Sequence, residues 1–189
     1  MPLTESELIK RAKQGDKKAL SALVSAYSDR IYNLALRILR NKEDAEDILQ
    51  ETFLIVLKKL ESFDERSSFF TWIYRIATNA SLMKLRKKKI IFADLPDKPD
   101  LEEKLFIDWS QDPSLNVQNE EIREVLENSI RELSDIYRSV FILRDIEHLS
   151  IRETSQILNI SEENVKIRLR RARLFLRDKV STKFQEGVV

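Results

Sequence analysis

The apolar residues of this chain recur every three or four positions, the spacing that gathers them on one face of an α-helix. The longest such run predicts a helix over residues 17–40, with Asn41 as a plausible end. A second long helix is expected over 42–60, and a third after Thr71 as far as the basic cluster at 84–89. The first half of the chain is therefore expected to be a small bundle of helices.

Capping residues mark where several helices begin. Thr4 and Glu7 have the spacing of a capping box, so a short helix is expected to start at Thr4. The second half holds further N-cap candidates: Ser134, Ser150 with Glu153, and Ser161. These caps bound four shorter expected helices: 120–132, 135–147, 151–158 and 162–180.

Residues 93–121 break the regular pattern. They contain three of the four prolines and nine acidic residues, and they sustain no helical period. Such a composition is typical of a segment between domains. We therefore expect a flexible acidic linker over 93–119, which separates a domain of residues 1–92 from one of residues 120–189.

Composition and charge narrow the possible classes. The chain has no cysteine, which excludes disulfides and cysteine-ligated zinc. Neither a signal peptide nor an apolar run of membrane-spanning length is evident, so we expect a soluble, cytoplasmic protein without a membrane span. Net charge is only +1, but residues 1–92 carry +6, residues 93–149 carry −9 and residues 150–189 carry +4. A polyanion that contacts both basic ends would suit this distribution, and so would chance.

The last two expected helices are joined by a turn of only three residues, 159–161. Two helices joined in this way, the second strongly basic, are typical of a DNA-binding helix-turn-helix. Val165, Leu169 and Ala172 would face the domain core. Outward positions that could meet bases or phosphates are occupied by Asn164, Lys166, Arg168, Arg170, Arg171, Arg173 and Arg177. The alternative interpretation of this helix is a basic surface that only faces solvent. The predicted fold of the whole chain is all-α, with two small helical domains, and the C-terminal domain contains the helix-turn-helix.

Aromatic and cationic residues alternate within residues 61–89. One side of the expected helix carries Trp72, Arg75, Asn79, Met83 and Arg86. The loop before it carries Phe63, Arg66, Ser67, Ser68 and Phe69. Rings beside cations suit single-stranded nucleic acid, because bases stack on the rings while the backbone meets Arg and Lys. For Phe69 and Trp72 a place in the core is an equally good interpretation, whereas Arg75 and Asn79 are harder to explain as core.

The helix expected over 42–60 has an acidic side opposite its apolar side. That side carries Asp44, Asp47, Gln50, Glu51, Leu54 and Lys58. A carboxylate metal site would require histidine partners. The only histidine, His148, lies elsewhere in the chain. A solvated face or a protein-docking face remains, and the expected exposure of Leu54 favours docking.

No arrangement of catalytic residues is evident. His148 has neither a second histidine nor a cysteine to complete a metal site, and we interpret it as stabilising a helix end or as exposed. The chain shows neither a Ser/His/Asp set nor a glycine-rich phosphate loop. We therefore expect no catalytic residues, no metal and no cofactor.

Three stretches, taken together, resemble the extracytoplasmic-function (ECF) sigma factors of bacterial RNA polymerase. DAEDILQETFLIVLKKL (44–60) resembles the family's core-polymerase-docking helix. FFTWIYRIATNASLMKLRKKK (69–89) resembles its −10 recognition and melting segment, and the stretch 133–173 resembles its −35-binding domain. The three occur in the family's order, and the resemblance covers nearly the whole chain.

The resemblance implies roles for individual residues. It implies core RNA polymerase as a partner, with Asp44, Asp47, Gln50, Glu51 and Leu54 as candidate contacts. It implies that the loop 63–70 captures a base of the melted −10 strand, with candidate contacts at Phe63, Arg66, Ser67, Trp72, Arg75, Asn79 and Arg86. It implies that the −35 duplex is read by Asn164, Lys166, Ile167, Arg168, Arg170 and Arg171. An anti-sigma factor is expected as a further partner.

Several positions depart from the family pattern, among them Glu163, where the usual glycine is lost, a change that a helix tolerates. Met83 stands where an aspartate is common, between Asn79 and Arg86, and this puts the local pairing of Arg86 in doubt. Ile167 replaces a serine, so an apolar contact, such as one with a thymine methyl, would replace a polar one. We therefore expect an unusual −35 preference.

Three functional hypotheses remain distinguishable. A sigma factor is a non-enzymatic specificity subunit that binds promoters well only with core polymerase. A stand-alone helix-turn-helix regulator would bind duplex DNA tightly alone, but would not explain the row of Trp72, Arg75 and Asn79. A metal-carboxylate bundle enzyme would retain metal on purification, and the missing histidine ligands argue against it.

Overall fold

The computed structural model describes residues 3–93 and 120–186, and the chain divides into two units, Met1–Leu105 and Phe106–Val189. Every regular element in these described ranges is helical, which confirms the expected all-α fold. The expected linker, 93–119, lies outside the described residues except for Ala93.

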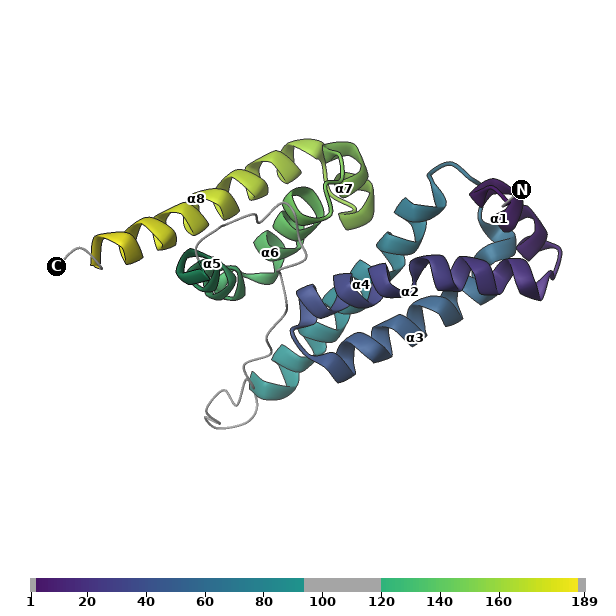
Figure 1. Ribbon diagram of the computed structural model, residues 1–189, viewed down its shortest axis with the longest axis horizontal. Helices are drawn as coiled ribbons and strands as arrows, with labels where there is room; N and C mark the ends of the chain where they lie inside the picture. The colour runs from purple at the N-terminus through teal and green to yellow at the C-terminus, as the bar shows by residue number, and fades with distance from the viewer. Residues whose placement is uncertain (1–2, 94–119, 187–189) are drawn as a thin grey trace. The chain divides into compact units, whose positions relative to one another are not determined.

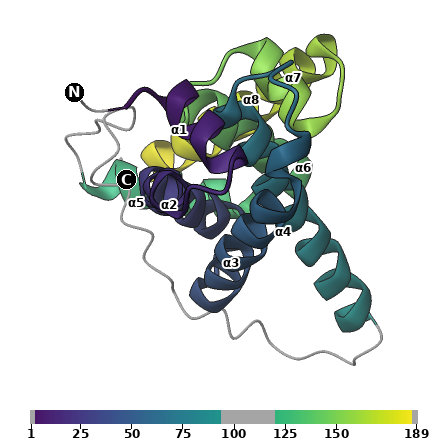
Figure 2. The ribbon, with the colours of Figure 1, turned by 90° about the vertical axis from the view of Figure 1, so that its right-hand side faces the viewer.

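The first unit is a bundle in which α2 packs against α1, α3 and α4, and α3 also packs against α4 (Figure 1). Figure 2 shows α1 lying beside α2. The elements are α1 (Glu5–Lys13), α2 (Lys17–Leu39), α3 (Lys42–Lys59), the 3-10 turn η1 (Leu60–Ser62) and α4 (Phe69–Ala93).

The core of the first unit is built from the periodic apolar positions. Ile31, Leu34 and Ile38 of α2 are fully buried, as are Ile48 of α3 and Tyr74 of α4. Full burial of a large aliphatic side chain contributes about 1.5–3 kcal/mol each. Packing of these amphipathic faces, more than the propensity of any single helix, therefore holds the bundle together.

The N-cap residues of the first unit agree with the sequence prediction for α1 and differ from it for α3 and α4. The Thr4–Glu7 capping box forms as expected. Asn41 does more than follow α2, because its side chain accepts a hydrogen bond from the Asp44 N–H at 2.8 Å and so begins α3. The start of α4 lies two residues before Thr71: Ser68 Oγ accepts from the Thr71 N–H at 3.1 Å, which makes Ser68 the capping side chain.

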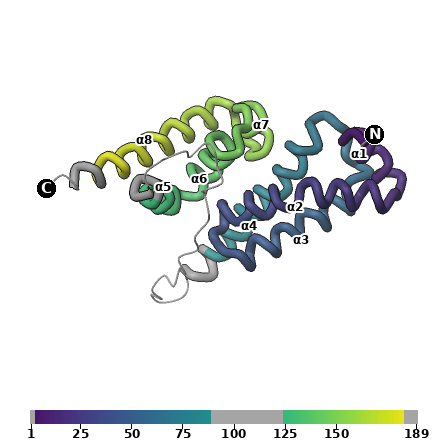
Figure 3. Tube along the Cα trace, in the orientation of Figure 1, coloured from purple at the N-terminus to yellow at the C-terminus, as the bar shows by residue number. Residues whose placement is uncertain are grey.

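The second unit contains α5 (Glu120–Glu132), α6 (Asp135–Phe141), the π-helical turn η4 (Ile142–Ile146), α7 (Ile151–Leu158) and α8 (Glu162–Glu186). The tube in Figure 3 follows α8 from its start beside α7 past α6 and α5, and α8 packs against all three. Val165, Leu169 and Ala172 are buried, as the spacing predicts. The helix expected over 135–147 is thus two elements, with η4 completing it.

All three N-cap positions expected in this unit are occupied as predicted, but only two of the side chains make a capping hydrogen bond. Ser150 and Glu153 form a capping box at the start of α7, and Ser161 Oγ accepts from the Asn164 N–H at 3.2 Å at the start of α8. Ser134 precedes α6, but its side chain makes no capping hydrogen bond. The buried Arg138 contacts this junction instead, since its guanidinium donates to the Leu133 carbonyl and to the Asp135 carboxylate.

Candidate nucleic-acid and protein interfaces

An exposed row of acidic and apolar side chains runs along α3. Asp47, Gln50 and Glu51 are exposed, and Leu54 is 56% exposed. Leu57, which the sequence analysis did not single out, lies one turn further on and is 48% exposed. We name Asp47, Gln50, Glu51, Leu54 and Leu57 the α3 face. Its apolar end is unusual for a solvated helix, because two neighbouring leucines remain uncovered.

The structure does not place Asp44 on this exposed row. The residue is only 8% exposed, and its carboxylate pairs with Lys84 at 3.0 Å and with Lys88. Lys84 also pairs with Asp47 at 2.7 Å. Asp44 lies on the side of α3 that faces α4, where a charge is tolerated because two lysines from α4 reach it.

Ion pairing fixes the charge of this carboxylate. Burial opposes ionisation of Asp44, but hydrogen bonds from Lys88 and Lys84 and their positive charges outweigh that effect, so the pKa of Asp44 is lowered. Burial likewise opposes the charge of Lys84, and its bonds to Asp47 and Asp44 reverse the balance and raise its pKa. The cluster at 84–89 is therefore divided, with Lys84 and Lys88 engaged by α3 while Arg86 is exposed.

The exposed side of α4 carries the row that the sequence predicts. Arg75, Asn79 and Arg86 are exposed, Met83 is 56% exposed and Trp72 is partly exposed. Met83 therefore presents an apolar group beside Arg86, where an acidic residue is common in the resembled family. We name Trp72, Arg75, Asn79, Met83 and Arg86 the α4 face.

The loop before α4 joins this face to the core through aromatic packing. Phe63 is 5% exposed and its ring centroid lies 4.9 Å from that of Trp72 and 5.7 Å from that of Phe69. Phe69 is 2% exposed, which settles it as core. Phe63 thus stands behind Trp72 with little free surface, whereas Arg66 is exposed and Ser67 partly so.

The start of α8 presents a mixed polar and apolar surface. Asn164, Lys166, Arg170 and Arg171 are exposed, Arg168 is partly exposed and Ile167 is 43% exposed. The Arg171 guanidinium donates to the Tyr137 hydroxyl at 3.2 Å, and this contact orients the side chain. Arg173 donates two hydrogen bonds to the Asp145 carboxylate, which raise its pKa further, so its charge is paired within the unit.

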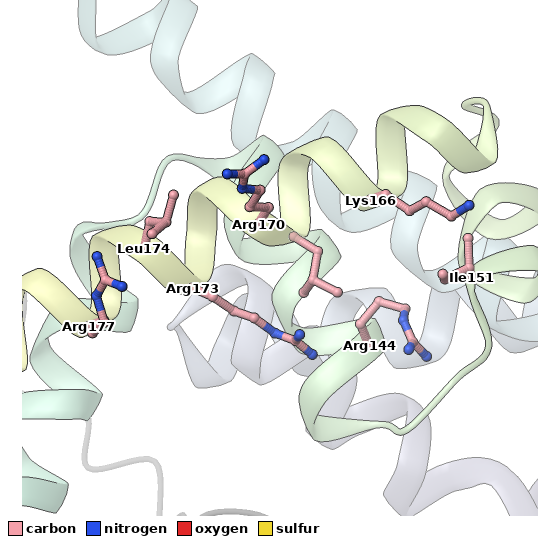
Figure 4. A pocket seen from close by; sticks show the side chains of 8 residues that line it. Arg144, Ile151, Lys166, Arg170, Arg173, Leu174 and Arg177 are labelled. Carbon is pink, nitrogen blue, oxygen red and sulfur yellow. The ribbon is translucent and has the colours of Figure 1, made fainter.

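A cationic pocket of about 450 Å³ adjoins this surface, between η4, the start of α7 and α8. Its lining includes the cations of Arg144, Lys166 and Arg170 and the apolar side chain of Leu169. In Figure 4 the Lys166 side chain extends toward Ile151, and Arg173 extends from α8 toward the turn that carries Arg144. The Arg144 Nε is buried without a hydrogen-bond partner. The sequence analysis missed Arg144, because only the fold brings η4 beside α8.

Among the residues that the structure describes, no cluster of three or more His, Cys, Asp or Glu side chains could hold a metal ion. His148 is exposed and takes a left-handed backbone conformation, with φ 53°, between η4 and α7. No helix in the described ranges is long and apolar enough to cross a membrane.

Two family models match the chain in the order of its two units. The model described as Sigma-70 region 2 matches residues 23–90, and the one described as Sigma-70 region 4 matches residues 123–176. The chain is 37% identical over 183 residues to the ECF RNA polymerase sigma factor SigW of Bacillus subtilis, which covers 94% of this chain and 97% of that protein. It is 30% identical to the ECF RNA polymerase sigma-E factor of Haemophilus influenzae, covering 94% and 96%.

Solved structures share the fold. The structure titled as CnrH in complex with the cytosolic domain of CnrY has a TM-score of 0.66 at 21% identity, covering 93% of this chain and 96% of that chain. The sigma factor RpoE of Bartonella quintana, solved with the anti-sigma factor NepR, has a TM-score of 0.65 at 20% identity, covering 87% and 98%.

Proposed function

Because this chain belongs to the extracytoplasmic-function family of RNA polymerase sigma factors, we propose that its two helical units share the work of promoter recognition. A sigma factor directs transcription initiation by bringing core polymerase to promoters. The observation that carries this proposal is the full-length relationship, with the two sigma-70 regions matched in order on the two units. We place this activity in the cytoplasm and assign the chemistry of RNA synthesis to the polymerase, not to this chain.

The α3 face is the proposed docking surface for core polymerase. Asp47 and Glu51 offer exposed carboxylates to a basic partner, while Leu54 and Leu57 offer uncovered apolar area. Charged groups chiefly give an interface its specificity and association rate, and buried apolar anchors contribute much of its affinity. Gln50 lies in the same row, and Asp44 is left out because α4 already engages it.

The α4 face and the loop before it are the proposed reader of the melted −10 strand. Trp72 offers part of a ring for stacking, Arg75 and Arg86 offer cations to the backbone, and Asn79 offers an amide to a base edge. Arg66 and Ser67 lie in the loop where an extruded base would enter. Extrusion of a base costs a few kcal/mol, and a Trp72 ring that Phe63 already holds in place would help to offset that cost.

The start of α8 and the cationic pocket are the proposed reader of the −35 duplex. Asn164, Ile167 and Arg171 are exposed and would meet base edges in the major groove. Arg168 borders them, while Lys166, Arg170 and Arg144 line the pocket and would offer cations to a phosphate oxygen. Phosphate contacts of this kind make affinity fall steeply as salt rises.

An anti-sigma factor is the second proposed partner. One structure of the same fold is titled as the sigma factor RpoE in complex with the anti-sigma factor NepR, and another as CnrH in complex with the cytosolic domain of CnrY. For this chain, recovery of the tagged protein from unstressed cells in an equimolar complex that competes with core polymerase would support the proposal. Recovery solely with polymerase under all growth conditions would contradict it.

Docking is tested by gel filtration of the purified chain with bacterial core RNA polymerase. The wild type is expected to co-elute, and an Asp47→Lys/Glu51→Lys variant is expected to lose most of this association. The control Asp29→Lys/Glu124→Lys reverses the same number of exposed charges away from the α3 face and should co-elute normally. If both variants co-elute equally well, the docking surface is not the α3 face. If the wild type does not associate with core polymerase, the proposed sigma-factor function is contradicted.

A further inference from the structure

The last residue of α1 reaches across to the loop that precedes α4. Lys13 is only 24% exposed at its side chain, and its Nζ donates a hydrogen bond of 2.6 Å to the carbonyl oxygen of Phe63. The same ammonium lies 3.4 Å from Glu65 Oε1 and 5.3 Å from the centre of the Phe63 ring. One cation thus contacts the loop at its backbone, at an aromatic face and at a carboxylate.

These contacts matter because the loop adopts a shape that it does not favour alone. Glu65 has φ 58°, in the left-handed region that residues with a Cβ seldom occupy. Such a conformation is unfavourable and persists only where surrounding contacts impose it. Lys13 contacts the residues on either side of Asp64, so it restrains the part of the loop in which Glu65 is strained.

The contacts of Lys13 are unequal in strength. Glu65 is 63% exposed, so its ion pair with Lys13 contributes little by itself. The bond to the Phe63 carbonyl is shorter and partly buried, and a charged donor makes such a bond stronger than a neutral one. The same residue, Phe63, packs its ring against Trp72 of the α4 face. The path from α1 to the proposed base-binding surface is therefore Lys13, Phe63 and Trp72.

Lys13 is not itself placed to bind DNA, because its ammonium donates to the loop and its side chain is three-quarters covered. It also precedes residues 23–90, the range that matches the sigma-70 region 2 model. Neither the comparisons nor the charge pattern of the sequence therefore assigns it a role in promoter recognition.

We propose that Lys13 is a positioning residue for −10 recognition, which tethers the loop 63–68 to α1 and thereby sets the shape of the base-capturing pocket. This inference rests on the proposed function of that loop. Lys13 acts through Phe63 and the loop backbone and makes no contact with the DNA. Its removal should therefore reduce base discrimination, and not merely the electrostatic attraction between protein and DNA.

The test uses holoenzyme assembled from core polymerase and the full chain, with fluorescent single-stranded non-template −10 oligonucleotides substituted with each base in turn. Lys13→Met retains the aliphatic stem and removes the charge. We expect it to weaken binding of the preferred oligonucleotide roughly three- to tenfold, the size of one lost partly buried hydrogen bond. Non-preferred bases should be affected less, so that discrimination falls. Lys13→Arg, which can donate the same bond, should restore discrimination.

Lys10→Met is the matched control, because it removes one exposed lysine from the same helix. If Lys13→Met lowers affinity for all bases by the same factor, or by no more than Lys10→Met, Lys13 contributes only charge or general stability and the proposal is overturned. If the wild-type holoenzyme itself shows no base preference, the proposed role of the loop fails. A wild type that discriminates while Lys13→Met discriminates equally well refutes the role of Lys13 alone.

Discussion

Replacement of Asp44 by Asn tests whether the ion pairs between α3 and α4 stabilise the first unit. The change preserves the size of the side chain but removes the charge that Lys84 and Lys88 share. It also leaves two lysines of α4 facing an amide. The first unit should therefore lose stability although no apolar contact has been removed.

The expected loss in the free energy of unfolding follows from the exposure of the Asp44, Lys84 and Lys88 side chains. The Asp44 side chain is 11% exposed, Lys84 is 25% exposed and Lys88 is 42% exposed. Removal of one partner from a buried pair costs about 3–5 kcal/mol, whereas an exposed pair contributes about 1 kcal/mol or less. Since both lysines can turn toward water when Asp44 is neutral, we expect a loss of about 1–2 kcal/mol.

Asp47→Asn is the matched control. It removes a carboxylate that shares Lys84, but the Asp47 side chain is 68% exposed. Water therefore already screens its charge, and the expected loss is below about 0.5 kcal/mol. A difference between the two variants isolates the effect of burial from the effect of losing one negative charge.

The assay is urea denaturation followed by the fluorescence of Trp72, in a Trp109→Phe background so that one tryptophan of the first unit reports. The pH dependence gives a second readout. Because its pKa is lowered in the folded state, Asp44 contributes stability that is present above roughly pH 4 and lost as the pH falls through the lowered value. Asp44→Asn should therefore flatten the acid side of the stability profile. Equal stability losses for Asp44→Asn and Asp47→Asn, with unchanged acid profiles, would refute the reasoning.

Three further predictions concern the other surfaces. Ser150→Ala removes a capping-box hydrogen bond and should destabilise the second unit by about 1 kcal/mol, while Ser134→Ala, whose side chain makes no capping bond, should change thermal or urea stability little. Arg144→Gln should weaken holoenzyme binding to −35 duplex and reduce the slope of log affinity against log salt by about 1. An unchanged slope would show that Arg144 does not contact a phosphate. Leu57→Asn should weaken core polymerase binding measured by titration, without loss of stability, since Leu57 is 48% exposed; unchanged affinity would exclude Leu57 from the α3 face.

Helical periodicity was sufficient to predict the α-helices and their order, because each helix buries one continuous face, but it did not separate η4 from α6. The order of the helices, the capping boxes at Thr4 and Ser150 and the buried positions Val165 and Leu169 all follow from short-range spacing. The predicted start of α4 was three residues too late, because Ser68 and not Thr71 occupies the N-cap position.

Side-chain roles that depend on contacts between helices could not be predicted from spacing. Asp44 lies in the same acidic run as Asp47, and only the packing of α4 shows that lysines engage it. Lys13 and Phe63 are 50 residues apart, and Arg144 reaches the pocket beside α8 through a π-helical turn that periodicity does not reveal. Asp44 could have been identified from two features of the sequence. It directly precedes Ala45, a residue on the buried side of α3, and the helix expected to pack beside it ends in a lysine-rich cluster.

The central claim, that this chain gives core polymerase its promoter specificity, is tested most directly by transcription in vitro. Core polymerase would transcribe genomic DNA of the source organism with and without the chain, and the RNA 5′ ends would be sequenced. The account predicts new start sites that share one −35 element and one −10 element, and that are lost with the Asp47→Lys/Glu51→Lys variant. If the chain yields no new start sites with core polymerase but binds duplex DNA tightly alone, it acts as a stand-alone regulator and the account is contradicted.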